Sequence, residues 1–282
     1  MKFRKMHGIG NDFVFVRVKS DDELERMQRC SKAICDRNFG VGADGLIVLS
    51  PSSVADVKMT LFNSDGSIAR MCGNAVRCIG RIISEERGDD RPVTIETLGG
   101  IKTVWIAEKG EGAWKVRVDM GEPVLKASAI PVVGHGDGEV INAAFDIDGN
   151  EMTFTCVSMG NPHAVTFVDD LDRDEMMKLG PVVENCKDFP DRTNVEFVKV
   201  DEKGLNVLVW ERGAGPTLAC GTGACAVLVA ACKSGRCGRK SAVNLPGGSL
   251  YIEWGDDNRV YMTGPAEHVF YGEISEIAGI DL

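Results

Sequence analysis

Hydrophobic and polar positions follow two periodicities along this chain, and the same order of elements occurs twice. Between residues 21 and 35 apolar side chains recur at helical spacing among charges, which predicts an amphipathic helix. Short runs rich in Val, Ile and Phe predict strands on both sides of it. In the first half we predict strands at 13–18, 46–49, 57–62, 93–95, 102–106 and 114–119, and helices at 21–35 and 75–86. In the second half we predict strands at 154–157, 164–168, 195–200, 205–210, 250–254 and 260–263, and helices at 172–179 and 224–233.

The predicted helix at 224–233 is apolar on almost every side. A helix without a polar face must be enclosed by other structure, and the flanking strands are the available material. We therefore expect an α+β fold of two pseudo-symmetric domains, each a curved, mostly antiparallel, barrel-like β-sheet around one central α-helix. We expect the domains to be 1–124, joined by the C-terminal segment 269–282, and 125–268, with the Gly- and Pro-containing stretch 122–137 as the crossover.

Two Cys-Gly turns stand at equivalent places in the two halves. One is Cys-Gly-Asn-Ala at 72–75 and the other is Cys-Gly-Thr-Gly at 220–223, and the two cysteines are 148 positions apart. Asn63 precedes the first cysteine by nine residues, and Glu211 precedes the second by nine. Two related halves can face each other across a pseudo-twofold axis. We therefore expect the two sulfurs to point at one small cavity from opposite sides.

Composition and charge narrow the kind of protein. The 282 residues are 44% hydrophobic and 26% charged, which is ordinary for a globular protein. The net charge of −10 and the lack of a dense basic tract argue against a nucleic-acid partner. The longest apolar run, at 224–232, is shorter than the ~20 residues of a membrane helix. No segment of signal-peptide quality follows residues 1–7, so we expect a cytoplasmic protein without a membrane partner.

The ten cysteines do not suggest a disulfide framework in a chain of this length. No C-x-x-C pattern occurs, so neither a zinc ribbon nor a thioredoxin-like motif is supported, and we expect no metal site. Most of the cysteines are expected to be small buried hydrophobic residues. The two Cys-Gly cysteines are the exceptions.

A cysteine at a helix N-terminus suits proton transfer beside a carboxylate. The unpaired N–H groups and partial positive charge of the helix end favour the thiolate and form a socket for an anion. Gly73 and Gly221 leave that socket open, and Asn74 and Thr222 can add side-chain donors. One sulfur would remove an α-proton as thiolate, and the other would return a proton to the opposite face as thiol. No Lys-centred pyridoxal motif is present, so we expect no cofactor.

Eight segments together carry a resemblance that covers most of the chain. They are GIGNDF (8–13), DRNFGVGADG (36–45), NSDGSIARMCGNAVRC (63–78), ETLGG (96–100), MGNPHAV (159–165), RTN (192–194), WERGAG (210–215) and TLACGTGACA (217–226). With them the chain resembles the diaminopimelate epimerase family. The resemblance implies a cofactor-independent epimerase that interconverts L,L- and meso-2,6-diaminopimelate in lysine and peptidoglycan precursor biosynthesis. It also implies a homodimer.

The resemblance also implies roles for individual residues. Cys72 and Cys220 would be the acid–base pair. Glu211 is expected to support them, and so is His163 of the Asn-Pro-His run if it lies near a catalytic thiol; a histidine in the core or at a strand end is the alternative for His163. Substrate contacts are implied for Asn11, Asn63, Gly73, Asn74, Asn161, Asn194, Glu211, Arg212, Gly221 and Thr222. The residue chemistry agrees, because the guanidinium of Arg212 can hold a distal carboxylate in a bidentate fork. One position departs from the family pattern: Gly45 stands where many relatives carry a glutamine that contacts substrate.

Two other functions remain open at this level. A racemase of proline-like or other amino acids would also use a Cys-Gly-Thr-Gly turn, although the run Glu211-Arg212-Gly213 favours a long substrate with a second polar end. A thiol-based redox or metal-binding protein is the other alternative, and metal analysis would test it. The sequence does not assign either cysteine to either stereoisomer.

Overall fold

The computed structural model describes residues 1–281 and forms two compact units. Unit 1 contains Met1–Val118 and the chain from Thr263 onward, and unit 2 contains Asp119–Met262. In this structure the chain crosses from one unit to the other after residues 118 and 262. From the sequence we expected these boundaries after residues 124 and 268.

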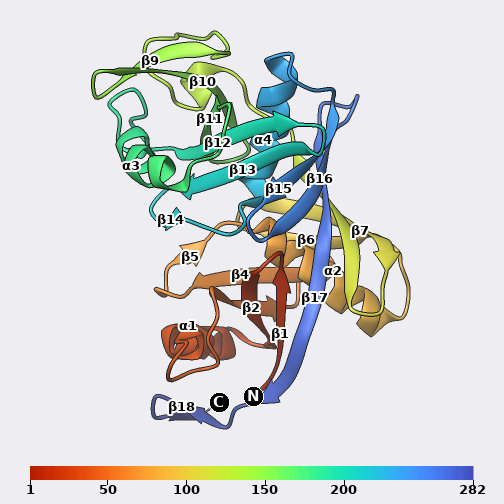
Figure 1. Ribbon diagram of the computed structural model, residues 1–282. Helices are drawn as coiled ribbons and strands as arrows, with labels where there is room; N and C mark the ends of the chain where they lie inside the picture. Colours follow the sequence, from red (N-terminus) through yellow and green to blue (C-terminus); the bar gives the residue numbers. More distant parts are fainter. Residues whose placement is uncertain (282) are drawn as a thin grey trace. The chain divides into compact units, whose positions relative to one another are not determined.

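Unit 1 alternates short strands with two helices (Figure 1). Its elements are β1 (Lys2–Gly8), β2 (Asn11–Arg17), α1 (Asp21–Cys35), β3 (Gly45–Ser50), β4 (Val57–Asn63), β5 (Ile68–Ala69), α2 (Gly73–Arg87), β6 (Val93–Thr97), β7 (Gly100–Lys109) and β8 (Ala113–Gly121), whose last residues belong to unit 2. The C-terminal part of β17 (Val260–Glu273) and the short strands β18 (Glu276–Ile277) and β19 (Ile280–Asp281) also belong to unit 1.

Unit 2 contains the corresponding series of strands and helices (Figure 1). Its elements are η1 (Ala127–Ala129), β9 (Ala143–Ile147), β10 (Asn150–Ser158), β11 (Pro162–Phe167), α3 (Arg173–Glu184), β12 (Asn194–Asp201), β13 (Gly204–Glu211), β14 (Gly215–Pro216), α4 (Gly221–Lys233), β15 (Lys240–Leu245), β16 (Gly248–Trp254) and the beginning of β17 (Val260–Glu273).

The sheet of unit 2 repeats the strand pairing of unit 1. In unit 1, β1–β2, β3–β4 and β6–β7 are antiparallel pairs, and β2–β3 and β4–β6 are parallel pairs. In unit 2, β10–β11, β12–β13 and β15–β16 are antiparallel, and β11–β12 and β13–β15 are parallel. The register also agrees, because Phe13 pairs with Gly45 in β2–β3 and His163 pairs with Asn194 in β11–β12. The predicted α+β fold with two pseudo-symmetric halves is therefore confirmed.

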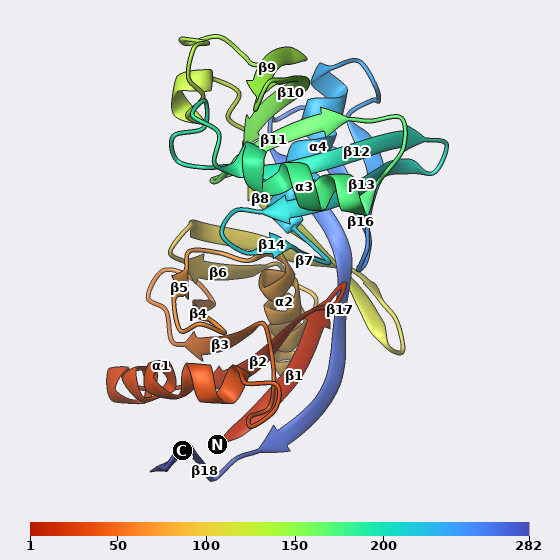
Figure 2. The ribbon, with the colours of Figure 1, turned by 60° about the vertical axis from the view of Figure 1, so that its left-hand side comes forward.

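Each unit encloses one helix, as the apolar pattern predicted. Helix α4 packs against β10, β11, β12, β13, β15 and β16, and α2 packs against β1, β6 and β7 (Figure 1, Figure 2). Every residue of α2 from Gly73 to Ser84 is buried. Helix α4 begins immediately after Cys220, and α2 begins immediately after Cys72. The sheets thus hold both Cys-Gly turns at the N-termini of buried helices.

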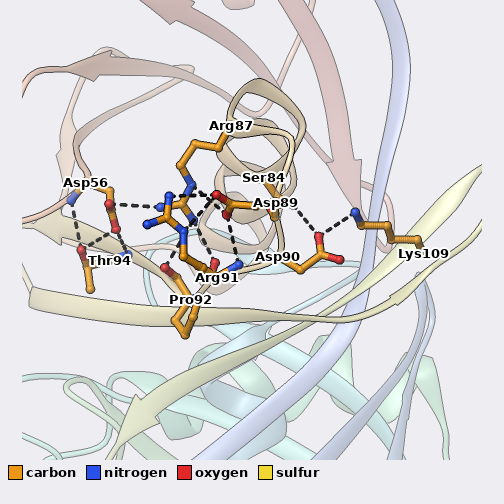
Figure 3. A network of polar contacts seen from close by, with 9 residues as sticks. All are labelled: Asp56, Ser84, Arg87, Asp89, Asp90, Arg91, Pro92, Thr94 and Lys109. Atoms are coloured by element: carbon orange, nitrogen blue, oxygen red, sulfur yellow. Dashed lines mark hydrogen bonds and ion pairs between the residues drawn. The ribbon is translucent and has the colours of Figure 1, made fainter.

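A polar network anchors the C-terminal end of α2 (Figure 3). Arg87 donates to Asp56 Oδ1 at 3.2 Å and to the carbonyl oxygen of Arg91 at 2.8 Å. The hydroxyl of Ser84 donates to the carbonyl oxygen of Asp89 at 2.7 Å. Gly88 ends the helix in the left-handed conformation that favours glycine. The network connects the helix to the start of β4 and β6, and so fixes the element that carries Cys72.

The sequence did not predict strands β5, β9, β14, β15, β18 and β19, and three further differences concern β1, β17 and α3. Strand β1 was missed, and β17 runs for 14 residues although a strand was predicted only over 260–263. These two strands pair with each other, for example at Met6 and His268. Each strand is therefore stabilised by hydrogen bonds to a distant partner, which the local sequence pattern of neither strand indicates. Helix α3 continues past Pro181 to Glu184, beyond the predicted end at residue 179.

Hydrophobic cores occupy the interior of each unit. The core of unit 1 includes Phe3, Ile34 and Phe62, and that of unit 2 includes Phe154, Phe189 and Phe197. Among the described residues, no helix has both the length and the apolar character needed to cross a membrane.

Candidate active site

Cys72 is the N-cap residue of α2. Its backbone is extended, with φ −140° and ψ 119°, so the helical conformation begins at Gly73. The sulfur makes no capping hydrogen bond to the helix and instead donates to Oδ1 of Asn11 at 3.5 Å. The cysteine is partly exposed, while Gly73 and Asn74 in the first turn are buried. The open helix end beside Cys72 can therefore still accept an anionic group.

Amide side chains around Cys72 form a connected series. The Nδ2 group of Asn11 donates to Asp44 Oδ2 at 2.8 Å, which turns the carbonyl oxygen of Asn11 toward Cys72. The same oxygen accepts from Asn74 Nδ2 at 3.1 Å. Asn74 in turn accepts from Arg77 at 2.7 Å. The positions of Asn11 and Asn74 are thus fixed by two residues, Asp44 and Arg77, that were not among the sequence-predicted site residues.

Arg77 is the largest fully buried side chain in the described part of the protein. Besides Asn74, it donates from Nε to the carbonyl oxygen of Pro265 at 3.0 Å. A Cβ atom on Gly8 would lie 2.5 Å from its guanidinium, so glycine at that position makes room for the arginine. A charged residue inside an otherwise apolar stretch of a buried helix was the sequence signal that could have identified Arg77.

Asn63 and Gly45 are paired with each other across β4 and β3. The side chain of Asn63 donates to Ser67 Oγ at 2.9 Å and thereby closes its own turn. A Cβ atom on Gly45 would lie 2.9 Å from the carbonyl oxygen of Phe62 and 2.9 Å from Leu61 Cδ1. The close approach of β4 explains why this chain has glycine there, and a larger side chain would require a backbone shift.

Cys220 is the N-cap residue of α4 and is more enclosed than Cys72. Its sulfur accepts from the backbone N–H of Gly223 at 3.3 Å and lies 3.5 Å from the Thr222 hydroxyl. Only 6% of the residue is exposed. Gly221 and Thr222 form the first turn of the helix. A Cβ atom on Gly223 would lie 3.2 Å from the sulfur, so this glycine permits the close approach.

The expectation that the helix end would favour the Cys220 thiolate is wrong. Burial raises the pKa of the Cys220 thiol well above its usual value, and the nearby carboxylates of Glu211 and Glu196 raise it further. The hydrogen bonds from Thr222 and Gly223 oppose the shift but are smaller effects. Desolvation and like charge thus outweigh the helix N–H groups, and Cys220 is a thiol at neutral pH.

Glu211 lies at the end of β13 beside Cys220. Burial raises its pKa, while the hydrogen bond from the Thr217 hydroxyl and the nearby His163 lower it. The carboxyl group interacts with Cys220 as well. The predicted supporting residue Glu211 is therefore in direct range of the thiol.

His163 is fully buried and forms a pair with Glu196, which is also fully buried. Nδ1 of His163 lies 2.6 Å from Glu196 Oε1, and Nε2 lies 3.1 Å from Oδ1 of Asn161. Among the described residues, no partner is present for the second carboxylate oxygen of Glu196. Sequence reasoning did not identify Glu196. Its only signal was one acidic residue in an apolar strand.

Asn194 and Arg212 are linked to each other. Asn194 is buried, donates to the carbonyl oxygen of Pro162 at 2.7 Å and accepts from the backbone N–H of Arg212 at 3.0 Å. Its amide therefore holds the protein backbone. The guanidinium of Arg212 is exposed and donates to the carbonyl oxygen of Asp191 at 2.9 Å. Arg212 remains accessible to an anionic ligand.

The described residues contain no group of three or more His, Cys, Asp or Glu side chains arranged to hold a metal ion. Within unit 1, the structure gathers Cys72, Gly73, Asn74 and Asn11. Within unit 2, it gathers Cys220, Gly221, Thr222 and Glu211, and it joins Asn161 to His163.

Comparison with known proteins adds the following findings. The family model described as "Diaminopimelate epimerase" matches residues 3–126 and 155–269. A protein of Desulfitobacterium hafniense named diaminopimelate epimerase is 51% identical over 282 residues, which is 99% of both chains. A protein of the same name from Methanococcus maripaludis (strain C5) is 50% identical over 97% of this chain and 99% of its own.

Solved structures with the same fold are more distant in sequence. The Bacillus anthracis phenazine biosynthesis protein of the PhzF family has a TM-score of 0.69 at 20% identity, covering 97% of this chain and 98% of its own. A probable proline racemase from Agrobacterium radiobacter K84, with bound carbonate, has a TM-score of 0.68 at 13% identity, covering 97% and 92%. At this level of identity the similarity concerns the fold alone.

Proposed function

Because this chain belongs to the diaminopimelate epimerase family, we propose that it interconverts L,L- and meso-2,6-diaminopimelate with Cys72 and Cys220 as the acid–base pair. The chain is an isomerase of the epimerase type. The observation that carries the proposed mechanism is the duplicated geometry. Each unit begins its enclosed helix directly after a cysteine, so each supplies a sulfur at a helix N-terminus.

In one direction of the reaction, Cys72 acts as thiolate and takes the α-proton of the substrate. The electron pair of the broken C–H bond moves toward the substrate carboxylate, whose developing charge the helix N–H groups stabilise. Cys220 donates its thiol proton to the opposite face of the same carbon. The configuration inverts, Cys72 ends as a thiol and Cys220 ends as a thiolate. The reverse direction starts from that second protonation state.

Burial supports the assignment of Cys220 as the initial proton donor in this direction. Its pKa is raised by desolvation and by Glu211 and Glu196, so the free protein holds it as a thiol. Giving up the proton leaves a thiolate that the Gly223 N–H and the Thr222 hydroxyl can stabilise. No organic cofactor is required by these steps, because the two sulfurs and the helix ends supply the proton transfer and the charge stabilisation.

The distal end of diaminopimelate requires its own recognition groups. We assign its carboxylate to the exposed guanidinium of Arg212, and an ammonium group to the carboxylate of Glu211. Asn11, Asn63, Asn74 and Asn161 complete the proposed substrate contacts. The buried amide of Asn194 contributes by holding the backbone of Arg212. The remaining parts of the proposal are a homodimer, a cytoplasmic location, and a role in lysine and peptidoglycan precursor biosynthesis.

A panel of amino acids incubated in deuterated water tests this function. We expect exchange of the α-proton with solvent deuterium only for L,L- and meso-diaminopimelate, and not for proline, hydroxyproline or glutamate. Starting from the pure L,L isomer, the inverted carbon of the meso product should carry deuterium, because its proton comes from a thiol that exchanges with solvent. Efficient exchange of proline without exchange of diaminopimelate would refute the proposed substrate.

A further inference from the structure

The two asparagines at equivalent positions of the duplicated fold have different hydrogen-bond partners. Asn11 follows Gly10 at the start of β2, and Asn161 follows Gly160 just before β11. Asn11 donates its NH₂ group to Asp44, so its carbonyl oxygen faces Cys72 and Asn74. Asn161 instead directs its carbonyl oxygen to His163 Nε2. Since the local backbone is duplicated, the neighbours of each amide must determine its orientation.

The neighbours of Asn161 differ from those of Asn11 in a way that the fold does not require. The strand registers make His163 equivalent to Phe13, and Glu196 equivalent to Ile47. Unit 1 therefore builds the same pair of strands with two hydrophobic residues. Burying two ionisable groups costs free energy that a hydrophobic pair avoids. The His163–Glu196 pair, fully buried with one carboxylate oxygen lacking a partner among the described residues, thus points to a functional role.

The hydrogen-bond partners of His163 define its protonation. A carboxylate only accepts hydrogen bonds, so Nδ1 carries a proton that it donates to Glu196 at 2.6 Å. Oδ1 of Asn161 also only accepts, so Nε2 carries a proton as well. The ring thus contacts Glu196 through Nδ1 and Asn161 through Nε2, and Glu211 is a second carboxylate in electrostatic range. The NH₂ group of the partly exposed Asn161 has no acceptor among the described residues.

We propose that Glu196 is a positioning residue, which acts through the His163 imidazolium to turn the Asn161 amide so that its NH₂ group faces a carboxylate of the substrate. This inference rests on the proposed function only in taking Asn161 as a substrate contact. A neutral His163 would accept at Nε2 from the Asn161 NH₂ group. The amide would then present its carbonyl oxygen, which repels a carboxylate. Glu196 therefore favours a substrate that places a hydrogen-bond acceptor, such as a carboxylate oxygen, next to the Asn161 amide.

Nitrogen-15 NMR of histidine-labelled protein tests the orientation without any substrate. The chain has four histidines, and His163→Gln identifies the signal of His163. We expect both ring nitrogens of His163 to be protonated in the wild type at neutral pH. In Glu196→Gln, which keeps the size of the side chain but removes its charge, we expect only one ring nitrogen to be protonated. A wild-type His163 with a single protonated nitrogen would overturn the proposal, and this result requires no variant to fold.

Steady-state kinetics with L,L-diaminopimelate tests the consequence. We expect Glu196→Gln to raise KM about tenfold, as for loss of one charge-assisted contact. We expect a smaller change in kcat, because Glu196 contributes less to the raised pKa of the Cys220 thiol than burial and Glu211 do. Asn161→Asp keeps an acceptor for His163 but replaces the outward NH₂ group by an oxygen. It should raise KM similarly without altering the His163 signals. Adding Glu196→Gln to Asn161→Asp should have little further effect on KM, because both changes act at one contact.

The outcomes separate this inference from the proposed function. A Glu196→Gln variant with lowered kcat and unchanged KM would overturn the positioning role, because Glu196 would then act on the chemical step. If the wild type epimerises no form of diaminopimelate, the proposed function fails, while the NMR result still decides whether Glu196 orients His163. Melting temperatures of the variants separate loss of folding from loss of binding.

Discussion

Gly223→Ala is a small perturbation placed directly against the Cys220 sulfur. Gly223 is the third residue of α4, and its N–H donates to the sulfur at 3.3 Å. An added Cβ would lie 3.2 Å from the sulfur and 2.7 Å from Glu196 Oε1. Both neighbours are buried, so the methyl group must displace the thiol, the carboxylate or the helix end. Each of these displacements moves the Cys220 sulfur, which we assign to proton transfer, or a group in contact with it.

The expected change in stability is small because two effects oppose each other. Inserting a methyl group into a packed interior costs about 1–3 kcal/mol. Replacing glycine by alanine inside a helix recovers about 0.5–1 kcal/mol of conformational free energy. The unfolding free energy should therefore fall by at most about 2.5 kcal/mol. Activity is more sensitive, because misplacing a reacting group by about 1 Å can lower the rate about 100-fold.

The assay measures kcat for diaminopimelate epimerisation together with urea unfolding. Gly238→Ala is the matched control in the same unit, since a Cβ there meets no atom within 4 Å. We expect Gly223→Ala to lower kcat about 100-fold while the protein remains folded, and Gly238→Ala to leave both quantities unchanged. Wild-type kcat in a folded Gly223→Ala protein would refute the assignment of the Cys220 sulfur as a reacting group held by this contact.

Three further predictions follow from individual side chains. Arg212→Ala should raise KM at least tenfold, because a charge-assisted contact is worth about 1.5–3 kcal/mol; an unchanged KM would identify Arg212 as a structural partner of Asp191. Arg87→Met should lower the unfolding free energy by about 1–2 kcal/mol with little change in kcat, and unchanged thermal unfolding would show that the network in Figure 3 does not stabilise α2. Burial raises the pKa of Cys78 from 9.0 to about 12. The unfolded protein therefore loses this thiol proton first, and the unfolding free energy should be constant below pH 9 and fall as the pH rises toward 12. Cys78→Ala should reduce this fall of the unfolding free energy in urea titrations from about pH 8 to about pH 11.

Local sequence patterns predicted the helices and strands that are stabilised mainly by their own residues. The helix at 21–35 has the predicted bounds, since Ser20 caps it and charged residues mark its exposed face. The enclosure of α4 follows from its apolar character and that of α2 from the duplication, and both helices start at a Cys-Gly turn. In contrast, β1 and β17 depend on pairing between residues more than 260 positions apart, such as Phe3 and Gly272. A sequence pattern contains no information about such a partner.

Candidate site residues that lie in a sequence motif could be predicted. Residues whose role depends on burial in the folded protein were missed. Cys72 and Cys220 stand out by their repeated spacing, and both lie at helix N-termini. Glu196 looks like an exposed strand residue until the register with His163 places it in the interior. The raised pKa of the Cys220 thiol has the same origin, because desolvation depends on the packed protein and not on the helix end alone.

The rates of epimerisation by Cys72→Ala and Cys220→Ala test the central claim most directly. Each variant retains the duplicated fold but lacks the acid–base group for one face of the substrate carbon. We predict that both variants fold, as judged by circular dichroism and thermal unfolding, and that neither converts L,L- to meso-diaminopimelate at a detectable rate. Turnover by either folded variant at a rate close to that of the wild type would contradict a mechanism in which both sulfurs are required.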